Sequence, residues 1–149
     1  MNVVKTIDIS VTPERVYSYL LDFPRHSEWT TPGHDVRIEP ASEGATVVGS
    51  VFNSEGHQMG EQRDRLEVTE LRPNHKLVYE ATMKNGSKFR HTLELETTSA
   101  GTRLSKRFES LRIAFPGPLM APFVATFILP KALEGDLRRM KANLENKAG

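Results

Sequence analysis

The sequence contains no cysteine in 149 residues, an absence that excludes disulfide bonds, cysteine-ligated zinc, iron–sulfur clusters and thiol catalysis. It also has almost no net charge, because 20 Lys and Arg residues stand against 19 Asp and Glu residues, and we therefore expect no nucleic-acid partner. Its histidines are few, and none lies two to four residues from another: His26, His34, His57, His75 and His91. Because this spacing gives no support to a local metal site, we expect neither a metal nor another cofactor.

Signatures of the common enzyme classes are also missing, among them the nucleophile elbow G-x-S-x-G, the P-loop, the dinucleotide motif G-x-G-x-x-G and the zinc motif H-E-x-x-H. The N-terminus has no basic region followed by an apolar run, so we expect no signal peptide. An uncharged stretch over 113–130 approaches the length of a transmembrane helix, but Pro116, Pro118, Pro122 and Pro130 interrupt it. We therefore expect a cytoplasmic protein without an integral membrane segment.

Charge is unevenly divided between the two halves of the chain. Residues 1–75 carry 7 basic and 12 acidic residues, a net charge of −5, whereas residues 76–149 carry 13 and 7, a net charge of +6. A basic half can bind an anionic partner or a membrane surface. It can equally reflect charges that alternate on solvated strands, and this is the interpretation that we favour.

Hydrophobic periodicity divides most of the chain into strands. Alternation of apolar and polar residues predicts strands at 3–9, 34–39, 45–54, 61–71, 76–83, 88–97 and 102–111. Thr12 and Pro13 are typical of a helix start and predict a helix over 13–22, with a further helical turn over 24–29. Asn85-Gly86 predicts a hairpin between two of the strands. Because the turns between successive strands are short, the pattern favours an antiparallel meander.

A single apolar face runs through the C-terminal part of the chain. Its members are spaced alternately four and three residues apart: Leu119, Phe123, Thr126, Pro130, Leu133, Leu137, Met140 and Leu144. This spacing predicts one long helix over about 118–146, with Asp136 among the charged residues of its outer face. Pro130 removes a hydrogen bond and clashes with the carbonyl of Thr126, so we expect a kink there. At about 150 residues per domain, residues 1–149 are expected to form a single domain.

The opening residues carry a resemblance to a known family. The first predicted strand leads into Pro13-Glu14-Arg15-Val16-Tyr17, Asp22 ends the first helix, and Trp29 follows the second. This pattern resembles the polyketide cyclase/dehydrase branch of the START-like (SRPBCC) superfamily, although Ser27 stands where many relatives have proline. The resemblance implies an α+β helix-grip fold, in which a curved seven-stranded antiparallel sheet wraps around a long C-terminal helix. It also implies a cavity between sheet and helix for a hydrophobic or amphipathic small molecule.

Three polar residues are expected to face inward and could orient or act on a ligand. His91 shares a strand face with Phe89, and a buried imidazole could move a proton. The hydroxyl of Tyr79 could orient a ligand carbonyl or phenol. Lys106 precedes Phe108 on an inward face, and since a buried lysine needs a partner, it is a ligand anchor, a salt-bridged residue or a rim residue. Each of the three could instead be an ordinary wall or core residue.

Apolar residues numerous enough to line a cavity accompany these three. With Tyr79, His91 and Lys106, the candidate ligand-binding residues are Trp29, Phe52, Phe89, Phe108, Phe115, Met120, Phe123 and Phe127. The same side chains could form a plain core. Met59 lies between glycines in a predicted hairpin loop that could gate the cavity mouth.

The favoured hypothesis is a protein that binds a hydrophobic or amphipathic small molecule, such as a polyketide, lipid or isoprenoid. A second hypothesis is a cofactor-independent cyclase or dehydratase with His91 as general base and Tyr79 as proton donor. A third is an interaction module, in which the basic half or the exposed flank of the last helix docks a protein or an anionic membrane. Members of the family differ widely in function, so fold alone does not choose among these. Monomer and homodimer both stay open.

Overall fold

The computed structural model describes residues 1–34, 37–57 and 61–146. The elements in chain order are β1 (Asn2–Ile9), α1 (Pro13–Leu21), the 3-10 helix η1 (Phe23–Glu28), β2 (Arg37–Pro40), β3 (Val51–Gly56), β4 (Gln62–Arg72), β5 (Lys76–Met83), β6 (Lys88–Thr98), β7 (Gly101–Arg112), α2 (Gly117–Phe123), the π-helix η2 (Val124–Ile128) and α3 (Leu129–Asn146). The predicted loop residue Met59 lies outside the described residues.

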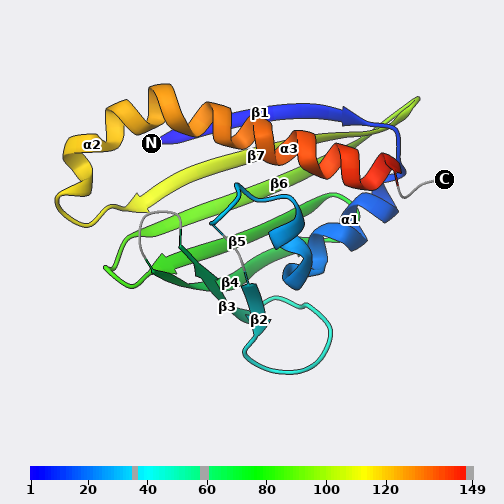
Figure 1. Cartoon of the computed structure of the whole chain (residues 1–149). Coiled ribbons are helices and arrows are strands. Elements are labelled where there is room, and N and C mark those ends of the chain that lie inside the picture. Colours follow the sequence, from blue (N-terminus) through cyan, green and yellow to red (C-terminus); the bar gives the residue numbers. More distant parts are fainter. Residues whose placement is uncertain (35–36, 58–60, 147–149) are drawn as a thin grey trace.

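The seven strands form one antiparallel sheet in the order β1-β7-β6-β5-β4-β3-β2. Strands β2 to β7 follow one another as the predicted meander, and β1 returns to pair with β7. At the predicted Asn85-Gly86 hairpin, Gly86 has a φ of 92° and donates its N–H to the Met83 carbonyl at 2.9 Å. The helical segments cross one face of this sheet (Figure 1), so the layered architecture is the one expected.

One strand begins later than the sequence predicts. The alternating stretch 45–54 yields a strand only from Val51, because Gly49 adopts a φ of +93° and turns the backbone. The turn is closed by the Ser50 N–H, which donates to the Val47 carbonyl at 3.0 Å, and it leaves Val47 and Val48 exposed. The predicted strand 34–39 corresponds to β2 at 37–40. An alternating pattern alone does not distinguish a paired strand from a solvent-exposed loop.

The predicted C-terminal helix is one continuous helical run made of three parts, α2, η2 and α3. The π-helical turn Val124–Ile128 lies just before Pro130, which has no N–H to donate to the Thr126 carbonyl. Wider winding relieves the clash between the proline ring and that carbonyl, so the irregularity appears one turn before the proline. Beyond it, α3 packs against β1 and buries Leu133, Leu137, Met140 and Leu144.

An aromatic stack fills the core beneath α1 and η1. The ring of Phe23, which is fully buried, stacks on Phe52 at 4.3 Å between centroids and meets Tyr79 edge-on at 5.1 Å. His26 stacks on the same ring at 4.3 Å. Because the stack joins η1 to β3 and β5, it closes one end of the space between sheet and helices.

Replacement of Phe23 by alanine should lower the free energy of unfolding by about 3–5 kcal/mol, since the change leaves a cavity in a closely packed stack. The matched control is Phe127→Ala, because Phe127 is 60% exposed and its loss should change stability by less than about 0.5 kcal/mol. Equilibrium urea denaturation of both variants gives the comparison. Similar losses in the two variants would contradict this assignment of the core.

Candidate functional site

A cavity of about 180 Å³ lies between the inner face of the sheet and the helical run. Its lining comes from the loop after η1, from β5, β6 and β7, and from η2 and α3: Thr30, Thr31, His34, Tyr79, His91, Lys106, Phe108, Ile128, Leu129, Ala132, Leu133 and Asp136. Polar side chains from sheet and loop therefore face a helical wall that is apolar except for Asp136.

Strand register brings three aromatic side chains into one row on the cavity floor. Tyr79 on β5 lies opposite His91 on β6, which lies opposite Phe108 on β7. The rings of Tyr79 and His91 stack in parallel at 4.7 Å with an angle of 3°, and Phe108 meets His91 edge-on at 5.1 Å. The predicted pair of His91 and Tyr79 thus converges on one cavity.

A buried ion pair forms the polar end of the cavity. Lys106 Nζ lies 2.9 Å from Asp136 Oδ2, and the two side chains are only 3% and 8% exposed. The other carboxylate oxygen of Asp136 accepts hydrogen bonds from Arg139 at 2.9 Å and from the Thr31 hydroxyl at 3.3 Å. The ammonium group of Lys106 also lies 4.8 Å from the centre of the Trp29 ring. A buried charge needs such multiple partners, because isolated in the interior it is strongly destabilising.

The loop that supplies Thr30, Thr31 and His34 is fitted closely onto the end of β3. A Cβ atom at Gly56 would lie 1.6 Å from the carbonyl oxygen of His34, so only glycine permits this approach. The same loop is fastened by the His57 N–H, which donates to the Gly33 carbonyl at 2.8 Å. These backbone contacts fix one wall of the cavity.

Residues 1–148 match the protein family described as polyketide cyclase / dehydrase and lipid transport. The chain belongs to this family. The predicted family is therefore confirmed. A comparison with curated proteins gave no match.

Solved structures have the same fold at low sequence identity. The Zhui aromatase/cyclase from Streptomyces sp. R1128 is 15% identical with a TM-score of 0.79, and the match covers 100% of this chain and 96% of that one. The di-domain aromatase/cyclase StfQ from the steffimycin pathway is 18% identical with a TM-score of 0.76, covering 99% of this chain and 52% of that one. Protein MLL2253 from Mesorhizobium loti is 21% identical with a TM-score of 0.73, covering 98% of both chains. The predicted helix-grip fold is confirmed.

In this member of the cyclase/dehydrase family, only some of the residues predicted to bind a ligand line the cavity. Tyr79, His91, Lys106 and Phe108 line it, whereas Trp29 and Phe52 are buried beside it in the core. Phe89 is partly buried and stacks on Phe108 at 5.0 Å without lining the cavity.

The four remaining candidates, Phe115, Met120, Phe123 and Phe127, do not line this cavity. All four are at least half exposed, and neither α2 nor η2 contains a buried residue. The reason is visible in Figure 1, where α2 projects past the end of β7, so that no sheet lies beneath it. Whether these residues bind a ligand stays a prediction.

Sequence reasoning missed the partner of Lys106. We expected Asp136 on the outer face of the last helix, but it is buried. It lies three residues after Leu133 and four before Met140, so the helical period places it on the buried stripe. An inward-facing lysine on one element and an acidic residue on the apolar stripe of another would together have indicated the pair. Thr30, Thr31 and His34 carried no comparable signal, because they occupy a loop.

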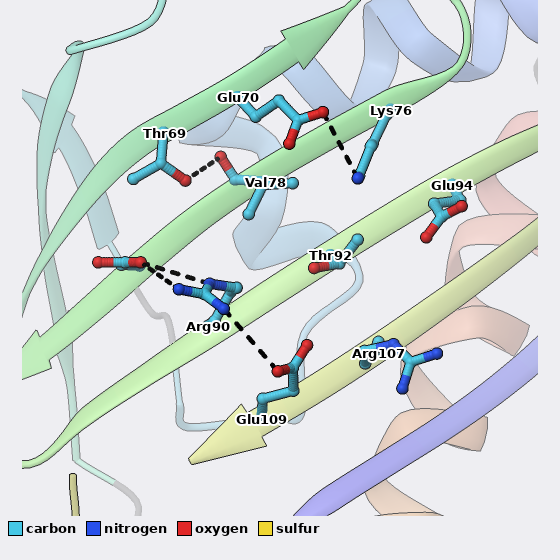
Figure 2. A pocket seen from close by; sticks show the side chains of 10 residues that line it. Thr69, Glu70, Lys76, Val78, Arg90, Thr92, Glu94, Arg107 and Glu109 are labelled. Carbon is cyan, nitrogen blue, oxygen red and sulfur yellow. Dashed lines mark hydrogen bonds and ion pairs between the residues drawn. The ribbon is translucent and has the colours of Figure 1, made fainter. Parts of the chain in front are cut away.

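A second and larger hollow, of about 420 Å³, lies on the outer face of the sheet (Figure 2). Charges of alternating sign line it, with Arg90 between Glu80 at 3.2 Å and Glu109 at 3.9 Å, and Lys76 beside Glu70 at 3.4 Å. Burial acts to raise the pKa of Glu80, but its hydrogen bonds to Lys88 and Arg90 outweigh this, and the pKa lies below its ordinary value. These interleaved charges support the interpretation of a solvated exterior for this part of the basic half.

The described ranges contain no group of three or more His, Asp or Glu residues that could hold a metal ion. Within the same ranges, no helix combines the length and apolar character needed to cross a bilayer. The cytoplasmic location stays a prediction.

The substitution Lys106→Met should lower the free energy of unfolding by about 3 kcal/mol, because it leaves the Asp136 carboxylate buried without the more deeply buried of its two cations. The double variant Lys106→Met/Asp136→Leu should recover most of this loss, since both buried charges are then removed. Lys5→Met serves as control. Lys5 of β1 forms an ion pair with Glu134 of α3 at 3.3 Å, and this half-exposed pair is worth less than about 1 kcal/mol. Thermal and urea unfolding measure all three, and a Lys106→Met loss no larger than that of the control would refute a stabilising role for the pair.

Proposed function

We propose that the protein binds an amphipathic small molecule whose polar, ring-sized end enters the cavity beside Lys106 and Asp136. The observation that carries this proposal is the convergence of a buried ion pair, a phenol and two imidazoles beneath an apolar helical wall. Small-molecule sites have this composition, with an apolar lining and a few fixed polar groups. The family description, which includes polyketide cyclases and lipid transport, agrees with a ligand of this kind.

The size of the cavity limits what can enter. Its volume of about 180 Å³ is below the roughly 300–1,000 Å³ of typical ligand sites, but a cavity of about 150 Å³ is sufficient for benzene. A single ring therefore fits, whereas a whole lipid or polyketide does not fit in this conformation. We propose that the remainder of the ligand extends past Ile128 and Leu129, where the wall is made by the partly exposed junction of η2 and α3.

The donors in the cavity define the chemistry of the bound end. Among the lining residues, Lys106 carries an ammonium group, Tyr79 a hydroxyl, and His34 and His91 ring nitrogens. These groups match carbonyl or phenol oxygens, as in aromatic polyketides. A ring inserted here would also contact the stacked row of Tyr79, His91 and Phe108.

Filling the cavity tests this proposal. Ala132→Leu places a larger side chain in the lining and should weaken binding of aromatic phenols and hydroxyketones at least about tenfold. Ala142→Leu is the matched control, because Ala142 is exposed on the same helix and its replacement should leave affinity unchanged. Native mass spectrometry and calorimetry supply the affinities. Equal binding by both variants, or no binding of any such compound to the parent protein, would contradict the proposal.

A catalytic role is the second candidate, because Tyr79 and His91 line the same cavity and stack on each other. The imidazole of His91 would remove a proton next to a ligand carbonyl, and the resulting enolate carbon would attack a second carbonyl, whose oxygen takes a proton from Tyr79. The product has the same mass as the substrate unless the new hydroxyl then leaves as water.

This second candidate predicts that His91→Gln lowers kcat/KM for cyclisation of a short poly-β-ketone thioester by about 10²-fold or more. Affinity for a non-reactive aromatic phenol should change far less. The assay follows product formation by liquid chromatography and mass spectrometry. If the parent protein produces no cyclised product above the spontaneous rate, only the binding function stays.

A further inference from the structure

One end of the helical run carries an exposed apolar patch that the cavity does not account for. The patch consists of Phe115, Leu119, Met120, Phe123, Phe127 and Ile128, each at least half exposed. Four-residue steps along α2 and η2 connect several of these side chains, and the rings of Phe123 and Phe127 contact each other at 5.1 Å. A cluster of this kind on a protein surface marks an interaction site, because isolated apolar residues are common on surfaces but contiguous groups of them are not.

The charged residues of the segment that carries the patch and of the adjoining hairpin are all basic. Over 110–133 and 81–88, every charged residue is basic: Lys84, Lys88, Arg112 and Lys131. The hairpin that carries Lys84 and Lys88 adjoins the patch, because the Ala114 N–H donates to the Ser87 hydroxyl at 2.9 Å. Lys88 is paired with Glu80 at 3.1 Å. Lys84, Arg112 and Lys131 form no ion pair within the described part of the chain, and all three are exposed.

We propose that this patch and its basic rim dock onto a lipid bilayer that contains anionic lipids. Phenylalanine, leucine and methionine side chains on one side of a helix insert at the boundary of headgroups and acyl chains, and nearby lysine and arginine side chains attract anionic headgroups. Lys131 follows Phe127 by four residues and therefore lies one turn further along the same side of the run. The apolar side chains are thus placed to contact the acyl chains of a bilayer, and the basic side chains are placed to contact its headgroups.

Charge argues against a second copy of this chain as the occupant. In a two-fold symmetric dimer the patch would face itself, so the basic rim of one copy, with Lys84, Arg112 and Lys131, would face the basic rim of the other. Such a contact brings cations together, whereas an anionic bilayer has the complementary sign. The patch includes Ile128, which also lines the cavity, so docking would bring the cavity close to the lipid surface.

Vesicle flotation tests the proposal with the full chain. We expect the parent protein to bind vesicles of phosphatidylcholine with phosphatidylserine, to bind vesicles of phosphatidylcholine alone more weakly, and to lose part of its binding at high salt. The variant Phe123→Ser/Phe127→Ser should bind at least about tenfold more weakly. Val47→Ser/Val48→Ser is its control, because these two valines are equally exposed but lie in the loop before β3, away from the patch, and the change should leave binding unaffected.

Charge reversal provides an independent test. Lys131→Glu should weaken binding to the anionic vesicles about fivefold or more, while Arg15→Glu, an exposed change of equal charge on α1, should have little effect. Failure of the parent protein to bind anionic vesicles would overturn the proposal. Equal losses of vesicle binding in a variant and its control would also overturn it. So would a dimer of the parent protein in sedimentation velocity, if the substitutions Phe123→Ser/Phe127→Ser dissociated that dimer. Circular dichroism spectra establish that every variant is folded.

Discussion

The buried contact between Lys106 and Asp136 is the constraint on which the arrangement of sheet, helix and loop depends. Two opposite charges removed from water stabilise a fold only when their geometry is good and their remaining hydrogen-bonding groups are satisfied. Here that requirement involves β7, α3 and the loop after η1 at once, since Thr31 and Arg139 also donate to Asp136 and Arg139 donates to the Trp29 carbonyl at 2.9 Å. The position of α3 along the sheet is therefore coupled to the wall of the cavity.

The C-terminal helical run has two environments with different consequences. In α3, apolar residues and Asp136 pack on the sheet and give the run its anchorage. In α2 and η2 no residue is buried, and α2 projects past the end of β7 (Figure 1). Segments with few buried contacts open at low cost in free energy. The α2 and η2 part of the run, which reaches the cavity at Ile128, is consequently the part best able to move for a ligand or to contact another surface.

Much of the fold followed from the sequence, and the errors have identifiable causes. Strand alternation gave the correct bounds for β5 at 76–83 and nearly correct bounds for β4, β6 and β7. It failed at 45–50, where the alternation of apolar and polar residues predicted a strand. There Val47 and Val48 lie in a loop, because Gly49 turns the chain. Within the site, alternation placed Tyr79, His91 and Lys106 inward as the structure has them, but it could not show that the three share one cavity.

The sequence by itself determined the spacing at which apolar residues repeat in each helix and strand. This spacing depends on the local backbone and on side chains only a few residues away. It did not determine what lies opposite each face. Asp136 is buried because Lys106, 30 residues earlier, and Thr31, 105 residues earlier, meet it in the folded chain. Phe123 and Phe127 continue the same apolar pattern and are at least half exposed, because no other element covers them. Burial depends on the opposing surface, and only the tertiary structure supplies that surface.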